Sequence, residues 1–222
     1  MPGEKHSVFV AGGTGYVGRP LIAQLLSRGH RVRALARSGS EGKLPAGCEV
    51  VPGNTLEPAS YAAKISPSDT FVQLVGVAHP SPAKAAQFRS IDFVSAAGAI
   101  ESAAKAGVRH FVYVSVAHPA PVMKAYIKVR MECEARLRES GMNATILRPW
   151  YVLGPDHRWP YFLLPLYWLM GALPATRAGA RRLGLVTRAQ MVAALVSAVE
   201  NPASGVRIVE VPEIRAAGRL ER

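Results

Sequence analysis

Residues 8–26 read VFVAGGTGYVGRPLIAQLL, and this stretch decides the fold. An apolar run typical of a buried strand ends at Gly12, and apolar residues return at helical spacing from Val17 onward. Glycines occupy positions 12, 15 and 18, at the turn between the two elements. Such glycines permit a tight turn, a close approach of the backbone to a pyrophosphate, and tight packing of the helix on the strand. The stretch therefore predicts a strand, a phosphate-binding turn and a helix.

The rest of the chain repeats this alternation of strand and helix. The apolar pattern predicts further strands at 31–37, 48–53, 70–77, 110–116, 143–149 and 205–212, and helices at 17–30, 84–106, 122–140 and 188–202. Strands separated by helices in this way predict an α/β fold with a doubly wound parallel sheet, the Rossmann arrangement. We expect one domain over residues 1–222, in which residues 150–222 contribute a small region that covers the substrate.

Residues 159–175 interrupt the alternation with the strongly apolar stretch WPYFLLPLYWLMGALPA. Three prolines break it, so it is a poor candidate for a membrane span. We interpret it as a buried or lid-like insertion over a substrate pocket. A dimer interface and a patch on a membrane surface are the alternatives, since arginines follow closely at 177, 181 and 182.

The composition indicates which kinds of ligand the protein is expected to bind and in which cellular compartment it is expected to work. The chain of 222 residues is 49% hydrophobic and carries a formal charge of +12, which favours anionic ligands. The charges are scattered rather than gathered in a tract, so no nucleic acid partner is expected. Cys48 and Cys133 belong to no metal-binding cluster, so no metal is expected and a reducing compartment fits. The first residues do not resemble a signal peptide, and we expect a cytoplasmic protein.

Several motifs resemble those of the short-chain dehydrogenase/reductase superfamily, in its extended or atypical branch. The glycines of GGTGYVG (12–18) are spaced GxxGxxG rather than GxGxxG, and VYVS (112–115) closes the fifth expected strand. ILRPWYVLGP (146–155) and the segment 191–211 extend the likeness over essentially the whole chain. The branch contains NmrA-like regulators and relatives of quinone and flavin reductases. The resemblance implies a domain that binds a nicotinamide nucleotide.

Arg37 stands at the end of the second strand, where NAD-preferring proteins carry an acidic residue. A guanidinium binds a 2′-phosphate that a carboxylate would repel, which predicts NADP(H) rather than NAD(H). The resemblance further implies that Asn54 and Leu56 border the adenine, Gly76 the adenosine ribose, and Pro149 the nicotinamide. The expected cofactor-binding residues are Gly12, Thr14, Gly15, Tyr16, Val17, Gly18, Arg37, Ser38, Asn54, Leu56, Gly76 and Pro149.

The resemblance also implies a catalytic set, formed by Ser115, Tyr126 and Arg130. Family members that reduce carbonyls use serine, tyrosine and lysine, and here the lysine position holds Arg130. Residues at i and i+4 share a helix face, so Arg130 can reach the ribose that a lysine would bind, and its charge should lower the pKa of Tyr126. An arginine cannot release its proton, however, so it cannot serve in a relay. The structural alternative is that Arg130 simply pairs with Glu134.

Two histidines follow expected strands, His79 in GVAHPSP and His118 in SVAHPAP. Ligands bind at the carboxyl ends of parallel strands, and an imidazole titrates near neutral pH. Either histidine could supply the missing proton path, or each could be an ordinary loop residue.

These observations favour an NADP(H)-dependent oxidoreductase that acts on a small hydrophobic carbonyl or quinone-like substrate. A non-catalytic nucleotide-binding redox sensor or assembly protein is the first alternative, because the lysine is replaced. An epimerase or dehydratase that acts on a nucleotide sugar is the second. The remaining expectations are a small-molecule substrate and, as an open alternative, a homodimer.

Overall fold

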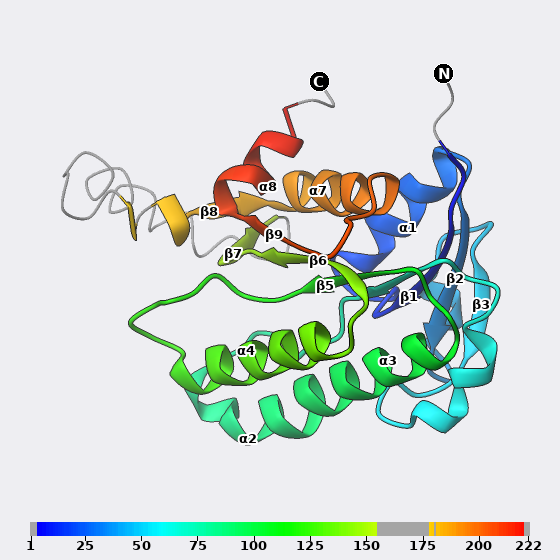
Figure 1. Cartoon of the computed structure of the whole chain (residues 1–222), viewed down its shortest axis with the longest axis horizontal. Helices are drawn as coiled ribbons and strands as arrows, with labels where there is room; N and C mark the ends of the chain where they lie inside the picture. Colours follow the sequence, from blue (N-terminus) through cyan, green and yellow to red (C-terminus); the bar gives the residue numbers. More distant parts are fainter. Residues whose placement is uncertain (1–3, 155–177, 180, 220–222) are drawn as a thin grey trace.

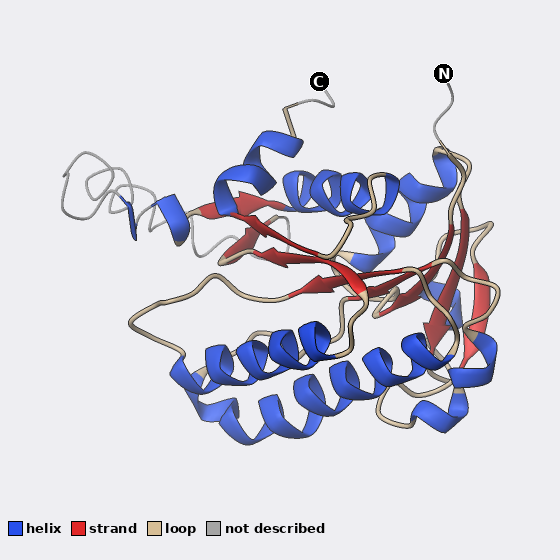
Figure 2. Ribbon diagram, viewed as in Figure 1, coloured by secondary structure: helices blue, strands red, loops and turns tan. Residues whose placement is uncertain are grey.

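The computed structural model describes residues 4–154, 178–179 and 181–219. Its main element is a sheet of seven parallel strands in the order β3-β2-β1-β4-β5-β6-β9. Helices α1, α7 and α8 cover one face of the sheet, and α2, α3 and α4 cover the other (Figures 1 and 2). The predicted doubly wound Rossmann arrangement is therefore confirmed.

The strands of the main sheet are short and close to their predicted positions. They are β1 (Ser7–Ala11), β2 (Arg31–Ala36), β3 (Glu49–Pro52), β4 (Thr70–Gln73), β5 (His110–Val114), β6 (Asn143–Arg148) and β9 (Val206–Glu210). The largest difference is in β4, which was expected to reach residue 77 but ends at Gln73. Residues 74–80, the β4 exit loop, leave the sheet instead.

The helices, apart from α8, also match the expected ranges within a few residues. They are α1 (Gly18–Ser27), α2 (Ala85–Gln87), the π-helix η5 (Phe88–Phe93), α3 (Val94–Lys105), α4 (Lys124–Glu139), α7 (Arg188–Glu200) and α8 (Val211–Ala217). The short 3₁₀ helices of the described residues are η1 (Glu41–Lys43), η2 (Pro58–Ser60), η3 (Ala62–Lys64) and η4 (Pro82–Lys84). The single helix expected at 84–106 is thus a succession of α2, η5 and α3.

Three elements were not foreseen. Strands β7 (Tyr151–Leu153) and β8 (Leu185–Thr187) pair in parallel outside the main sheet, and α8 follows β9 directly. Three-residue strands are too short to show a period of two, which explains why the pattern missed them. The apolar stretch 159–175 lies outside the described residues, so its interpretation as a lid, an interface or a membrane contact stays a prediction. Residues 188–210 add α7 and β9 to the layered sheet.

Helices bury both faces of the sheet. Alternate side chains of each strand therefore enter two different cores. On β1, Val8 and Val10 pack toward α1 and α7, while Phe9 packs toward α3 and α4. Phe9, Phe71 and Phe111 lie side by side on neighbouring strands, with ring centroids 5.1 and 5.2 Å apart. Burial on both faces accounts for the nearly continuous apolar sequence of the strands. The rigid sheet thereby fixes the position of the loops at its carboxyl edge.

Candidate functional site

The glycine turn after β1 is held so tightly that side chains are excluded. Gly12 has φ of +87°, and a β-carbon there would lie 3.1 Å from atoms of Leu74 and Val75. A β-carbon on Gly18 would collide with the carbonyl oxygen of Gly12, which is a backbone atom and cannot move aside. Helix α1 therefore approaches β1 as closely as the chain permits. This is the geometry that brings backbone amides next to a bound phosphate group.

The first turn of α1 is open to an anion. Its N-cap is Val17, which makes no side-chain hydrogen bond to the helix. Pro20 in this first turn has no N–H to satisfy. Uncapped amides and the positive end of the helix dipole together attract negative charge. The turn thus fits the diphosphate of a dinucleotide.

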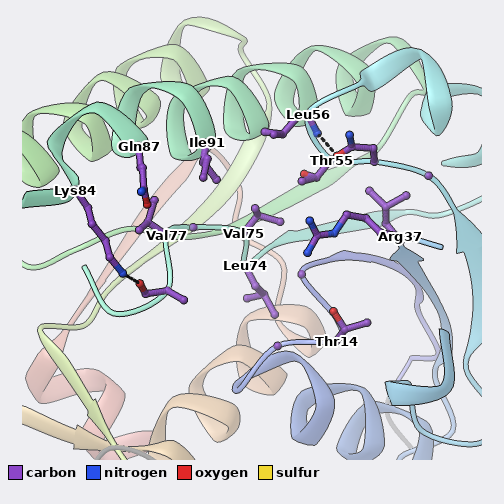
Figure 3. A pocket seen from close by; sticks show the side chains of 17 residues that line it. Thr14, Arg37, Thr55, Leu56, Leu74, Val75, Val77, Lys84, Gln87 and Ile91 are labelled. Carbon is purple, nitrogen blue, oxygen red and sulfur yellow. Dashed lines mark hydrogen bonds between the residues drawn. The ribbon is translucent and has the colours of Figure 1, made fainter. Parts of the chain in front are cut away.

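A cavity of about 430 Å³ opens above this turn; we call it the cradle cavity (Figure 3). It lies at the carboxyl ends of β1, β2, β3 and β4, where parallel sheets bind their ligands. The predicted cofactor residues that line it are Gly12, Thr14, Gly15, Arg37, Asn54, Leu56 and Gly76. The structure therefore brings these residues from four separate loops to one place.

Five predicted cofactor residues do not line the cradle cavity. Val17 packs against the core, Gly18 is buried beneath the turn, and Ser38 is exposed. Pro149 is buried, and its carbonyl oxygen accepts a hydrogen bond from the amide of Ala117. The ring of Tyr16 contacts the guanidinium of Arg188 at 5.0 Å and joins the glycine turn to α7.

Other lining residues were not predicted. They are Leu35, Gly53, Thr55, Leu74, Val75, Val77, Ala78, Lys84, Gln87 and Ile91. Lys84 reaches the cavity from η4, and its Nζ donates to the carbonyl oxygen of Ala78 at 2.6 Å (Figure 3). No short motif marks these positions, and four of them, Leu74, Val75, Val77 and Ala78, are carried into place by the β4 exit loop. The early end of β4 was the missing signal.

Asn54 lines the cradle cavity, but its amide is used within its own turn. Its Oδ1 accepts the N–H of Leu56 at 3.1 Å, and its Nδ2 donates to Glu57 at 2.9 Å. If Asn54 borders the adenine, as the resemblance implies, an adenine amine that donated to its Oδ1 would have to share that oxygen with Leu56. The turn nevertheless holds Leu56 at the cavity, as its expected packing against a flat ring requires.

A second hollow lies next to the cradle cavity and contains Tyr126. This tyrosine recess has a volume of about 30 Å³ and is lined by Pro80, Val116, Met123, Tyr126, Trp150 and Tyr151. The β4 exit loop borders both hollows, because residues up to 78 line the cavity and Pro80 lines the recess. Trp150 and Tyr151 meet edge to face, with centroids 5.6 Å apart. The recess is therefore a small, mostly apolar and aromatic site beside the cavity.

Backbone strain marks the rim of the tyrosine recess. His79 and Met123 have φ of 49° and 58°, in the left-handed region that residues other than glycine rarely adopt. Met123 lines the recess, and His79 directly precedes Pro80, which also lines it. Strained residues persist where the surrounding structure fixes them, and they gather at functional sites.

Arg130 lies in the interior rather than at the surface of either hollow. It is 5% exposed, and its Nη2 contacts Oδ1 of Asp92 at 2.6 Å. Its Nη1 donates to the carbonyl oxygen of Val114 at 2.9 Å and to the hydroxyl of Tyr113 at 3.2 Å. The alternative that Arg130 pairs with Glu134 is therefore wrong. Its partner comes from η5, on a different helix.

Tyr126 and Arg130 do meet, as the i, i+4 spacing predicted. The guanidinium carbon of Arg130 lies 5.1 Å from the centre of the Tyr126 ring, within the range of a cation–π contact. Phe88 packs on the same ring, at 5.0 Å between centroids. Burial raises the pKa of Tyr126, and this outweighs the opposing effect of Arg130. Arg130 thus acts on this pKa in the expected direction, but the net shift is upward because the partly buried phenol is costly to ionise.

Ser115 belongs to a different cluster. Its hydroxyl donates to Oε1 of Glu134 at 2.6 Å, and Arg148 donates to the same carboxylate at 2.9 Å through Nε. Burial works to raise the pKa of Glu134, but the hydrogen bonds from Arg148 and Ser115 outweigh it and the pKa is lowered. His118 lies 3.6 Å from Glu134, outside the tyrosine recess. The structure therefore brings Ser115 and His118 together at Glu134, and neither of them lines the tyrosine recess.

Two other kinds of site find no support in the part of the chain that the structure describes. No group of three or more potential ligand side chains there could hold a metal ion. Within the same residues, none of the helices combines the length and the apolar character that a membrane crossing requires.

Comparisons with known proteins agree with this geometry. A family model described as NAD(P)H-binding matches residues 12–166. A 3-diazoavenalumate denitrifying reductase of Streptomyces sp is 28% identical over 225 residues, covering 89% of this chain and 73% of the relative. The divinyl chlorophyllide a 8-vinyl-reductase of Zea mays is 26% identical over 67% of this chain. Photosystem II assembly factor Ycf39 of Synechocystis is 28% identical over 64% of this chain. The chain spans only 41% of the Zea mays protein and 43% of the Synechocystis protein.

Solved structures share the fold at lower identity. The Bordetella bronchiseptica enzyme WbmH, solved in complex with NAD⁺, has a TM-score of 0.69 and 20% identity, covering 92% of this chain and 75% of its own. MoeE5, solved with UDP-glucose and NAD, has a TM-score of 0.69 and 20% identity, covering 96% of this chain and 81% of its own. The glycine turn, the cradle cavity and the match over more than two thirds of the sequence lead to one conclusion. The chain belongs to the NAD(P)H-binding family.

Proposed function

We propose that the protein is an NADP(H)-dependent oxidoreductase that reduces a small hydrophobic carbonyl or quinone-like substrate. The observation that carries this proposal is the position of Tyr126 in a recess adjoining the cradle cavity. A bound nicotinamide supplies a hydride to the electrophilic atom of the acceptor. Protein groups must then orient the acceptor and deliver a proton to its oxygen.

Tyr126 is the proposed proton donor. A phenol is protonated near neutral pH, so Tyr126 can donate a hydrogen bond to the acceptor oxygen and then give its proton to the oxyanion that hydride addition forms. The recess of about 30 Å³ has room for a small group such as the acceptor oxygen, while Trp150 and Tyr151 at its wall favour a flat, apolar body outside it. Ser115 would contribute only if its hydroxyl turned away from Glu134, so its catalytic role stays a prediction.

The test measures NADPH oxidation by the purified protein against a panel of aromatic carbonyls and quinones. We expect at least one substrate, and we expect Tyr126→Phe to lower kcat by about 10²-fold, the usual contribution of a positioned acid. NADPH affinity should stay unchanged. Tyr61→Phe is the matched control, because Tyr61 is a buried core tyrosine outside both hollows. Equal activity of Tyr126→Phe and the unmodified protein would refute the role of Tyr126.

Arg37 supports the proposed preference for NADP(H). It lines the cradle cavity at the exit of β2, across from Lys84, Gln87 and Ile91 (Figure 3). A charge-assisted bond from Arg37 to a 2′-phosphate would contribute about 1.5–3 kcal/mol, or roughly 10- to 100-fold in affinity. Arg37→Asp should weaken NADPH binding by that factor and leave NADH binding nearly unchanged.

Arg31→Asp is the control for this exchange. Arg31 is equally exposed but begins β2, at the opposite end of the same strand. It should leave both affinities unchanged, apart from a small effect of net charge. Isothermal titration with each nucleotide measures both variants. Equal weakening of NADPH and NADH by Arg37→Asp would show that Arg37 does not recognise the phosphate.

A second candidate function is a nucleotide-binding sensor or assembly protein without turnover. The buried contact of Arg130 with Asp92 favours it, because the guanidinium is not free to take the lysine's place at the ribose. One relative is named as a photosystem II assembly factor. Tight NADPH binding, no turnover across the panel and co-purification of a protein partner would favour this candidate. The nucleotide-sugar alternative rests on the shared fold alone.

A further inference from the structure

We propose that Asp92 is a positioning residue that acts through Arg130: it retains the guanidinium beneath the β4 exit loop, where the pair supports both that loop and the ring of Tyr126. This inference rests on the proposed function, because it concerns the same site. It assigns the arginine that replaces the family's lysine an inward structural task instead of contact with the ribose.

The first argument is the burial and geometry of the pair. The side chain of Asp92 is 0% exposed and that of Arg130 is 6% exposed, and the two meet at 2.6 Å. A buried arginine without an anionic partner is strongly unfavourable, so each charge holds the other in place. Asp92 lies on η5 and Arg130 lies on α4, so the ion pair joins these two helices.

The second argument is the contact of the pair with the β4 exit loop. Oδ2 of Asp92 accepts the N–H of Val77 at 3.0 Å. Gly76 leaves room for Nη2 of Arg130, since a β-carbon at this position would collide with that atom. Gly76 and Val77 both line the cradle cavity. One carboxylate therefore fixes the arginine and a wall of the nucleotide site together.

The third argument is the π-helix that carries Asp92. η5 interrupts the run from α2 to α3, and π-turns are rare and frequently mark functional sites. Phe88 at its start packs on Tyr126, and Ile91 lines the cradle cavity. The same irregular turn thus supplies contacts to both hollows and buries Asp92 between them.

The pair also sets the electrostatic surroundings of Tyr126. Arg130 favours the phenolate and Asp92 opposes it, so removal of the Asp92 charge should make Tyr126 easier to ionise. The titratable or charged groups that face Tyr126 are Arg130 and Cys133 on α4, Asp92 on η5, Tyr113 on β5, which contacts the same guanidinium, and Tyr151 on β7, which lines the same recess. A test must separate Tyr126 from the other two tyrosines.

The experiment is a spectrophotometric titration of tyrosine ionisation in the protein without added nucleotide. Asp92→Asn should shift one tyrosine to lower pH, and the shift should disappear in the double variant Asp92→Asn/Tyr126→Phe. Asp69→Asn is the matched control, because it makes the same chemical change at the opposite edge of the sheet. An Asp92→Asn profile equal to that of the unmodified protein would overturn the proposal.

If Asp92→Asn does not fold, the variant Asp92→Asn/Arg130→Gln removes both charges and is measured in its place. We expect it to fold but to bind NADPH about ten-fold more weakly, since the β4 exit loop has lost its support. Unfolding of this double variant, or NADPH binding as tight as that of the unmodified protein, contradicts the inference.

Arg130→Lys distinguishes positioning from a direct lysine-like role. A lysine has one compact ammonium and cannot contact Asp92, Tyr113 and Val114 together. If Arg130 is a positioning residue, Arg130→Lys should bind NADPH more weakly. If Arg130 contacts the ribose directly, the same variant should bind NADPH as tightly and turn over as fast or faster. The tyrosine titration needs no turnover, so failure of the substrate panel would refute the proposed function and leave this inference standing.

Discussion

Individual glycines determine whether the first turn can form at all. Gly18 faces the carbonyl oxygen of Gly12, and no side chain can move to make room for a methyl group there. The sequence alone predicted the three turn glycines, because the tight turn itself leaves no room for a side chain at these positions. It could not predict that Gly76 makes room for Arg130, since that contact joins residues 54 positions apart whose meeting depends on the fold.

Gly18→Ala should lower the free energy of unfolding by about 1–3 kcal/mol, the usual effect of overpacking, and should weaken NADPH binding. Denaturant unfolding and isothermal titration measure the two effects. Gly42→Ala is the control, because a β-carbon there would have no atom within 4 Å and its φ is not positive. It should change stability by less than about 0.5 kcal/mol. Equal stability of the two variants would show that the turn tolerates a side chain.

Charged residues at the site were harder to predict than glycines. The i, i+4 spacing placed Arg130 beside Tyr126, and the structure agrees. The partner of Arg130 could not be read from α4, because Asp92 lies on another helix and Glu134 offered a plausible local carboxylate. Burial, rather than spacing, also decided the direction of the Tyr126 pKa.

At the scale of elements, long apolar patterns were reliable and short irregular pieces were not. The main strands and α1, α4 and α7 begin and end within a few residues of their predicted limits. The π-helix η5 was invisible, because its sequence FRSIDF fits an ordinary helical turn. Strands β7 and β8 are stabilised by pairing with each other, which a single sequence does not reveal.

The start of α7 gives a test at this scale. Thr187 accepts the N–H of Gln190 at 3.1 Å, and Gln190 in turn accepts the N–H of Thr187 at 2.9 Å. This capping box encloses Arg188, the first residue of α7, whose guanidinium contacts the ring of Tyr16 in the glycine turn. Thr187→Ala should cost about 1 kcal/mol in unfolding free energy, while Thr187→Ser should retain most of the stability. A urea midpoint that falls equally in both variants would argue against the cap.

At the scale of the whole molecule, the amino-terminal edge of the sheet should make stability depend on pH. His110 is 1% exposed, and burial together with nearby Arg207 and His6 lowers its pKa from 6.5 to about 4. The unfolded chain therefore binds a proton at a pH where the folded protein does not. Stability is complete above about pH 6.5 and falls as the pH drops toward 4, by about 3 kcal/mol from this group.

His110→Gln should flatten the pH dependence of unfolding between pH 6.5 and 4, although it also lowers stability at neutral pH. Denaturant unfolding at several pH values measures the slope. Titration of surface carboxylates continues in both proteins, so only the difference between their slopes is informative. Identical slopes would mean that His110 has the same pKa in the folded protein as in the unfolded chain.

The pairing of β7 with β8 has a consequence for how this scaffold can be altered. Tyr151 lies beside Leu185 and Leu153 lies beside Thr187, so two short strands that are far apart in the sequence run side by side in the same direction. Tyr151 also lines the tyrosine recess, and its neighbour Leu185 belongs to a strand that leads directly into α7. A change in the register of this small pair would therefore move one wall of the recess while the seven-stranded sheet stayed in place.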